Sequence, residues 1–229
     1  MPQKIYTIPL SFPLNLGSVN CYLVQTGSGF FLIDSGPTNQ RAALEKELQD
    51  AGCHPGDLKL ILITHGDFDH TGNAAFLRQK FATQTAMHPA DAGMAEKGDM
   101  FYNREQPNLL VRMLAPLVIR FGKSQRFTPD IPLQEGDDLS QYGFEAQVLH
   151  LPGHSSGSIG ILTADGDLFC GDLFGNSGQP EFSSIMDDMA TAMASLEKLE
   201  PLDIGTVYPG HGQPFPMAQL LSTLHNQNE

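Results

Sequence analysis

The sequence predicts a layered α/β or α+β fold with mixed sheets, and three observations support this prediction. Short apolar runs typical of strands recur along the chain, and amphipathic helical patterns separate several of them. The glycine-rich segment Gly27-Ser28-Gly29 joins two early runs and indicates a hairpin, whereas the later runs alternate with helices. The chain has 229 residues, 41% of them hydrophobic and 17% charged, which is a globular composition with enough length for a sizeable core.

The predicted elements follow from the spacing of apolar residues. Leu44 and Leu48 share one face of a predicted helix, and Ala74, Leu77 and Phe81 share one face of the next. The predicted helices are Arg41–Ala51, Thr71–Phe81, Thr191–Leu199 and Met217–His225. The predicted strands are Ile5–Ile8, Cys21–Gln25, Phe30–Ile33, Leu60–Thr64, Ala146–Leu151, Ile159–Thr163, Leu168–Cys170 and Thr206–Tyr208.

Residues 89–130 break this alternation. Ala90–Lys97 is helix-like, Gly98–Pro107 is loop-like, and Asn108–Phe121 is apolar with a helical pattern. Two interpretations stay open, a helical layer that covers a sheet and a cap over a substrate pocket. No repeat, linker or low-complexity segment divides the chain, so we expect one domain over residues 1–229 with a cap-like helical insertion at about 89–130.

Charge and cysteine content narrow the function classes. The formal net charge of −13 disfavours a phosphate backbone as partner, so no nucleic acid is expected. Cys21, Cys53 and Cys170 are odd in number and have no paired spacing, which indicates free thiols in a reducing compartment. No apolar run approaches the ~20 residues of a membrane span, and no signal-peptide core is present near the N-terminus. These features predict a cytoplasmic protein that acts on a small molecule; the oligomeric state stays open, a homodimer included.

The most informative segment follows the apolar run at residues 60–64. There His65, Asp67, Asp69 and His70 lie within six residues, just before a helical pattern. Imidazole and carboxylate groups that converge on one turn suit zinc, manganese, iron or cobalt. Asp69 also lies where a carboxylate can cap a helix, so its position alone leaves both roles open.

The same arrangement recurs three times further along the chain. A histidine or aspartate stands beside a glycine after an apolar run in Pro152-Gly153-His154, in Gly171-Asp172 and in Pro209-Gly210-His211. One such residue is usually an ordinary loop residue. Four strand ends that each deliver one indicate a site held by a rigid sheet.

Taken in order, these motifs resemble the metallo-β-lactamase superfamily, and most closely its glyoxalase-II-like hydrolases. The resemblance spans about residues 18–215, and Asp34 in Leu32-Ile33-Asp34-Ser35-Gly36 fits the acidic residue that follows an early hairpin in that family. It implies a four-layer αββα sandwich, with two mixed β-sheets flanked by helices and metal at one edge. It also implies two divalent metal ions per chain, zinc by family. The implied ligands are His65 and His154 for the first metal, Asp69, His70 and His211 for the second, and Asp172 as the bridge.

The sequence departs from the family at one position. The family turn usually reads His-x-His-x-Asp-His, and Asp67 stands where the second histidine is expected. One interpretation makes Asp67 a ligand, as the carboxylate of iron-binding flavodiiron-type relatives is; the other makes it too short to reach, which would weaken the first site. As a ligand, Asp67 would add negative charge, raise the pKa of bound water, and shift the preference from zinc toward manganese or iron.

The resemblance and the ligand set together predict a metal-dependent hydrolase that uses a metal-activated hydroxide on a small soluble ester-type substrate, with thioester or lactone favoured. Asp69 and Asp172 are the candidates to orient the nucleophile and take its proton. Phe174, Asn176 and Tyr102 are candidate substrate-binding residues. The 18 residues after His211 contain no lysine or arginine, which disfavours glutathione thioesters. The alternatives are a phosphodiesterase, an iron-dependent redox enzyme of the same fold, and a binding module without activity, which the matching ligand positions disfavour.

Overall fold

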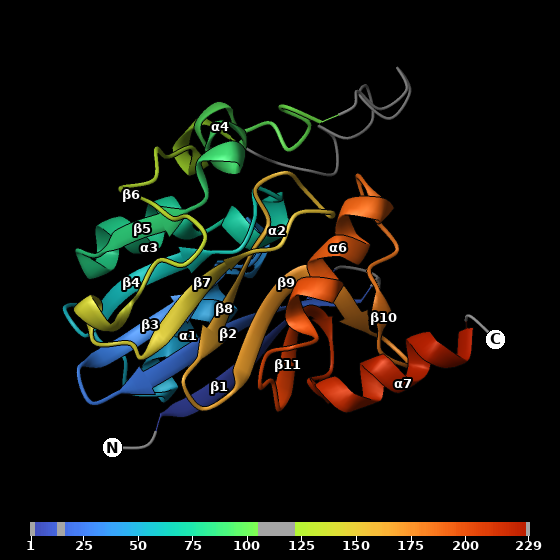
Figure 1. Ribbon diagram of the computed structural model, residues 1–229. Coiled ribbons are helices and arrows are strands. Elements are labelled where there is room, and N and C mark those ends of the chain that lie inside the picture. The colour runs from blue at the N-terminus through green and yellow to red at the C-terminus, as the bar shows by residue number, and fades with distance from the viewer. Residues whose placement is uncertain (1–2, 13–16, 105–121, 228–229) are drawn as a thin grey trace.

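Two six-stranded sheets lie face to face in the computed structural model, which describes residues 3–12, 17–104 and 122–227 (Figure 1). The first sheet has the order β1-β2-β3-β4-β5-β6, in which β1, β2 and β3 are antiparallel and β3 to β6 are parallel. Its strands are β1 Lys4–Ser11, β2 Ser18–Thr26, β3 Gly29–Ile33, β4 Leu58–Ile63, β5 Gln84–Met87 and β6 Ile131–Pro132.

The second sheet has the order β12-β11-β9-β8-β7, and β10 also pairs with β9. It is mixed as well, because β9 and β11 run parallel whereas the other pairs are antiparallel. Its strands are β7 Ala146–His150, β8 Ile159–Thr163, β9 Asp167–Asn176, β10 Glu181–Phe182, β11 Thr206–Gly212 and β12 Phe215–Pro216.

Helices pack on the outer side of each sheet, apart from the one-turn α2, which follows the turn after β4. They are α1 Arg41–Asp50, α2 Phe68–Thr71, α3 Ala74–Phe81, α4 Pro89–Lys97, α6 Met189–Leu199 and α7 Met217–Gln227, with short 3₁₀ turns at Thr38–Gln40, Lys123–Gln125 and Ser140–Tyr142. Among the described residues, no helix is both long and apolar enough to cross a membrane.

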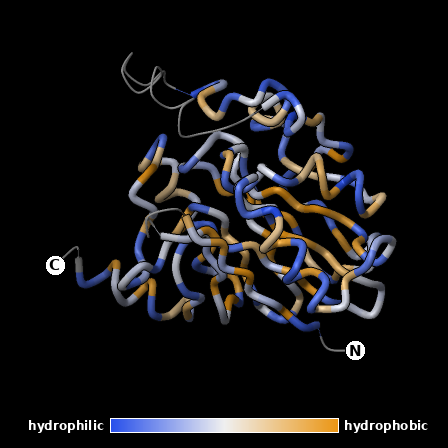
Figure 2. Tube along the Cα trace, turned by 180° about the vertical axis from the view of Figure 1, so that it is seen from behind, coloured by the Kyte–Doolittle hydropathy of each residue, from blue (hydrophilic) through white to orange (hydrophobic). Residues whose placement is uncertain are grey.

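Three apolar cores separate the four layers. Successive side chains of a strand point to opposite faces of its sheet, so neighbouring residues face different cores. Along β4, Ile61 and Ile63 face the core shared with α1 and α3, whereas Leu60 and Leu62 face the core between the sheets. A third core joins the second sheet to α6 and α7. Figure 2 shows the hydrophobic residues concentrated along the strands in the middle of the molecule. Each fully buried aliphatic side chain contributes about 1.5–3 kcal/mol, so these cores hold the strand ends rigidly.

The predicted strands are all present, and the mixed α/β architecture is confirmed. The predicted helix Thr71–Phe81 is wrong in detail, because α2 and α3 are separated at Gly72-Asn73. Asn73 Nδ2 donates to the carbonyl oxygens of Ser35 and Pro37 at 2.8 and 3.0 Å, which ties this break to the loop after β3. Asn108–Phe121 lies outside the described residues, so the cap and the one-domain organisation remain predictions.

Candidate metal centre

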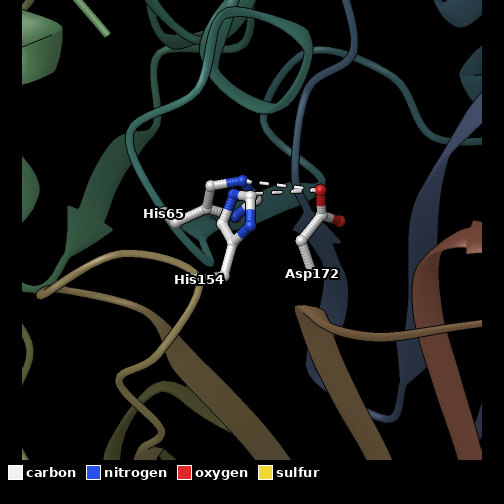
Figure 3. A group of neighbouring side chains, drawn as sticks. All are labelled: His65, His154 and Asp172. Atoms are coloured by element: carbon white, nitrogen blue, oxygen red, sulfur yellow. Dashed lines mark ion pairs between the residues drawn. The ribbon is translucent and has the colours of Figure 1, made fainter. Parts of the chain in front are cut away.

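The side chains singled out in the sequence converge at one edge of the two sheets. The turn after β4 brings His65, and the loop after β7 brings His154, next to Asp172 of β9; Figure 3 shows both imidazoles pointing toward that carboxylate. The ligand atoms of these three residues lie within 4.8 Å of one another. Asp69, His70 and His211 form a second group by the same measure. We call these the first and second ligand groups.

Asp172, a member of the first ligand group, also faces the imidazoles of the second. Its Oδ2 is 3.9 Å from His65 Nε2 and 4.0 Å from His154 Nε2 on one side, and 3.2 Å from His211 Nε2 on the other. Its Oδ1 is 3.4 Å from His70 Nε2. Through Oδ2 this carboxylate lies close to imidazoles of both groups, and its Oδ1 lies close to His70 of the second, as expected of a ligand shared by two metals.

The expectation that each ligand stands just past a strand is wrong for Asp172 and His211. Asp172 lies within β9 and His211 within β11, because the parallel pairing of these strands continues past their glycines. The register of the pair shifts on both sides of Pro209. A bulge of this kind re-aims side chains within a strand, which brings His211 toward Asp172.

The unpaired polar atoms of the site indicate what the two groups can hold. His65 Nε2, His70 Nε2 and Asp172 Oδ1 are buried and have no hydrogen-bond partner among the described residues. A buried polar atom without a partner costs about 1–3 kcal/mol, so three in one place call for a ligand. A Cβ at Gly210 would lie 2.0 Å from Asp172 Oδ1, so glycine is needed there for the carboxylate to fit. Nitrogen and oxygen donors of this kind fit divalent zinc, iron, manganese or cobalt.

The four imidazoles are all oriented in the same way. In each one Nδ1 contacts an oxygen atom outside the two groups, which leaves Nε2 facing the centre. The Nδ1 partners are Thr64 Oγ1 for His65 at 3.0 Å, Asp34 Oδ2 for His70 at 2.7 Å, Ile185 O for His154 at 2.7 Å and Ser18 O for His211 at 2.7 Å. Since Thr64 Oγ1 donates to Asp34, its lone pair is available to accept from His65.

Asp34 is buried and adopts a left-handed backbone conformation with φ of 60°, which is unfavourable for a residue with a Cβ. Its carboxylate accepts from Thr64 N at 2.9 Å and from Thr64 Oγ1 at 2.8 Å, and it faces His70 Nδ1. Asp34 therefore connects the turn after β3 to the orientation of one imidazole in each group.

The carboxylates give the site a strong negative field. Burial and the neighbouring His70 and His154 lower the pKa of His65 well below its ordinary value, so His65 is neutral and able to act as a ligand. Burial also opposes charge on His70, but the carboxylates of Asp172 and Asp34 outweigh it and raise the pKa of His70. Burial opposes charge on Asp172 too, yet His70 and His211 hold the pKa of Asp172 well below its usual range. These shifts keep His65 neutral and Asp172 ionised, and such a pair of donors suits a bound cation.

Asp67 reaches the first ligand group. Its Oδ2 lies 3.1 Å from His154 Nε2 and 3.7 Å from His65 Nε2. Its role as a metal ligand remains a prediction. Asp67 is also the N-cap residue of α2, and Asp69 lies inside that short helix, so Asp69 does not serve as its cap.

The sequence interpretation missed two residues that hold the ligand loops. Asp91 of α4 is fully buried and accepts from Gly66 N at 2.9 Å, Ser155 Oγ at 2.6 Å and Gly157 N at 2.8 Å, so it joins the loops of His65 and His154. Arg104 donates to Asp67 Oδ1. No local pattern distinguishes either residue, because their partners lie far away in the sequence.

The three candidate substrate-binding residues have structural partners. Phe174 is fully buried and packs against Phe182 in the core beneath α6 and α7, so its side chain does not face an open surface. Asn176 Nδ2 donates to Gln213 O at 3.0 Å. The Tyr102 ring lies 4.7 Å from Lys97 Nζ. For Asn176 and Tyr102 a substrate contact remains a prediction.

Comparison with known proteins agrees with this architecture. The family described as the Metallo-beta-lactamase superfamily matches residues 14–211. Hydroxyacylglutathione hydrolase GloC of Haemophilus influenzae is 32% identical over 206 residues, which cover 87% of this chain and 88% of GloC. Acyl-coenzyme A thioesterase MBLAC2 of Bos taurus is 29% identical over 222 residues, which cover 92% of this chain and 75% of that protein.

Among solved structures, TTHA1623 in a di-iron-bound form is 33% identical with a TM-score of 0.69, covering 93% of this chain and 96% of that one. The match to the family model extends over most of the chain and includes every residue of both ligand groups. The chain therefore belongs to the metallo-β-lactamase superfamily of metallohydrolases.

Proposed function

We propose that this protein is a binuclear metallohydrolase that cleaves a small thioester. The observation that carries the proposal is the pair of ligand groups on either side of Asp172, with buried nitrogen and oxygen atoms that lack protein partners. The names of two relatives support the bond type, since hydroxyacylglutathione and acyl-coenzyme A are both thioesters. We further propose a soluble small-molecule substrate, a cytoplasmic location and no nucleic-acid or membrane partner.

Each ligand group would hold one metal ion. When bound, two divalent ions supply a water molecule of lowered pKa and polarise the carbonyl oxygen of the substrate. The proposed ligands are His65, Asp67 and His154 for the first ion, Asp69, His70 and His211 for the second, and Asp172 for both. Zinc and iron both suit these donors, and the carboxylate of Asp67 favours iron or manganese more than an imidazole would.

Access to the site differs between the two groups. The side chain of His211 is 31% exposed, whereas those of His65, His70 and His154 are 0–1% exposed. Water and substrate therefore reach the centre from the side of His211 and its neighbour Asp69, whose Oδ2 lies 3.5 Å from His211 Nε2.

This exposure suggests the roles of the two carboxylates. Asp69 is the proposed proton acceptor, because its carboxylate lies on the accessible side. Asp172 is the proposed orienting group, because its oxygens lie between both pairs of imidazoles. The thiolate of a thioester leaves without prior protonation, so one carboxylate that takes a proton from water and then gives it to the thiolate suffices.

The test is a substrate panel on purified protein of known metal content. It contains a hydroxyacyl-glutathione, short and long acyl-coenzyme A thioesters, a lactone and an activated phosphodiester. We expect kcat/KM of about 10⁴ M⁻¹s⁻¹ or more for a thioester, two metal ions per chain, and loss of activity on chelation. Asp172→Asn should lose more than 100-fold, whereas Asp99→Asn on the exposed loop after α4 should not.

Two outcomes would contradict the proposal. A lactone or phosphodiester turned over ten times faster than every thioester would place the substrate in another class. Full thioester hydrolysis by protein stripped of metal would remove the role of both ligand groups.

A second candidate, an iron-dependent redox enzyme, is supported by Asp67 and by the di-iron-bound state named for one relative. It predicts stoichiometric iron, a coloured protein and oxygen consumption without thioester hydrolysis.

A further inference from the structure

Arg104 lies beside the first ligand group, where it contacts Asp67 and the backbone of His154. Its side chain is only 6% exposed. Nη1 lies 2.5 Å from Asp67 Oδ1 and 3.3 Å from Met100 O, Nη2 lies 3.2 Å from His154 O, and Nε lies 2.8 Å from Asp187 Oδ2. One buried guanidinium thus connects the turn after β4, the loop after β7 and the segment before α6.

The two oxygens of Asp67 face in different directions. Oδ1 accepts from Arg104, while Oδ2 lies 3.1 Å from His154 Nε2 and 3.7 Å from His65 Nε2. Because a carboxylate is planar, a donor fixed on Oδ1 also fixes the direction of Oδ2. An aspartate reaches less far than a histidine, so its orientation decides whether it contributes to the first group.

Asp67 stands where the family usually has a neutral histidine, so as a ligand it adds one negative charge. The positive charge of Arg104 can offset this added charge. Asp67 is buried, and Arg104 donates to its Oδ1, so the positive charge of the guanidinium lies directly beside this carboxylate. Asp187, the other carboxylate beside Arg104, is 36% exposed and therefore more strongly screened by water. Arg104 therefore interacts more strongly with the carboxylate of Asp67 than with that of Asp187.

The same guanidinium also supports His154. Arg104 Nη2 donates to the carbonyl oxygen of His154, and Arg104 Nε holds Asp187. Asp187 lies two residues after Ile185, whose carbonyl oxygen contacts His154 Nδ1 at 2.7 Å. Arg104 therefore contacts His154 directly and reinforces the segment that orients the imidazole of the same residue.

We propose that Arg104 and Asp67 form one unit, in which Arg104 is a positioning residue that aims Asp67 Oδ2 at the first metal and offsets the charge that aspartate brings in place of an imidazole. Hydrogen bonds to the outer oxygen of a ligating carboxylate commonly contribute 10–100-fold to metal affinity. This inference rests on the proposed binuclear site, and it assigns a function to a residue in the segment that follows α4.

The test is a double-mutant cycle with Arg104→Met, Asp67→His and the combined variant. Cobalt(II) absorption titrations give the affinity of each site, and elemental analysis gives the stoichiometry. In the wild-type background we expect Arg104→Met to weaken the first site about 10–100-fold and to leave the second unchanged. In the Asp67→His background, where no ligand charge needs to be offset, the same change should cost less than about threefold.

Three further variants control for folding and for loss of an ion pair. Arg104→Lys retains the charge but not the planar fork, so it should restore part of the affinity. Asp187→Asn removes a partner of Arg104 that lies outside the ligand groups and should weaken the first site less than Arg104→Met does. Arg78→Met removes the Arg78–Asp130 ion pair away from the site and should leave both affinities unchanged.

The outcomes separate the two proposals. If Arg104→Met lowers the metal affinity of the first site equally in both backgrounds, Arg104 only stabilises its loop. That result would overturn the inference and leave the proposed binuclear site intact. Tighter binding after Arg104→Met would mean that Arg104 competes with metal for Asp67, which also overturns it. A wild-type protein that binds one metal, at the second group alone, would overturn both proposals.

Discussion

Replacing Asp91 by asparagine removes one acceptor from a buried carboxylate that joins the loops of His65 and His154. An asparagine oxygen in the place of Oδ2 keeps the contacts with Gly66 N and Ser155 Oγ, but its amide nitrogen then faces Gly157 N across the 2.8 Å now spanned by a hydrogen bond. The loss of one hydrogen bond to a charged acceptor costs about 1.5–3 kcal/mol. At about 2–4 °C per kcal/mol for a chain of this size, Asp91→Asn should lower Tm by about 3–12 °C.

Thermal unfolding of metal-free protein measures this loss without the contribution of bound metal. Glu96→Gln is the matched control, because Glu96 is an exposed carboxylate of the same helix. Asp91→Ala, which loses all three contacts, should be destabilised at least twice as strongly as Asp91→Asn. The first ligand group should lose more metal affinity than the second, since His65 and His154 both belong to it. If Asp91→Asn melts within 1 °C of Glu96→Gln, the account of Asp91 as the link between the two loops is refuted.

Three further predictions concern other groups. Asp34→Ala removes the acceptor of His70 Nδ1 and should weaken the second metal about 10–100-fold, measured by cobalt(II) titration; an unchanged affinity would contradict this role. Burial opposes charge on His211, but Asp172 outweighs burial and raises the pKa of His211 from 6.5 to about 10. The His211–Asp172 pair therefore contributes its whole stabilisation of the metal-free protein below about pH 6.5, and this contribution is lost as the pH rises through about 10. Metal must displace that proton, so calorimetric titrations at pH 7 in buffers of different ionisation enthalpy should show proton release, and identical heats would count against it. Burial raises the pKa of Cys53 and Cys170 to about 12, so a thiol reagent should label them only after unfolding, and rapid labelling of the native protein would show that these thiols are accessible.

The sequence by itself determined the longer strands, most of the helices and the set of candidate ligands. A short apolar run that lies between two turn segments is typical of a buried strand, and it is too short for a helix. The strands β1 to β4 and β7 to β9 therefore follow from the local sequence pattern. His65, His154 and His211 stand beside glycines or prolines after such runs. The pattern therefore predicts that these imidazoles gather in one site, but His65 follows a strand of the first sheet and His154 and His211 belong to the second, so their meeting depends on how the two sheets pack.

The tertiary structure alone decided how the site is held. Asp91 lies 25 residues from Gly66 and 64 from Ser155, and Arg104 lies 37 from Asp67, so no local periodicity relates them. The same holds for the helix break at Asn73, whose amide partners lie more than 35 residues away. Local pattern reports which face of an element is apolar. The burial of a charged group and the identity of its partner depend on loops that meet only after the sheets have packed, and these contacts set the orientation and the charge of the ligand groups.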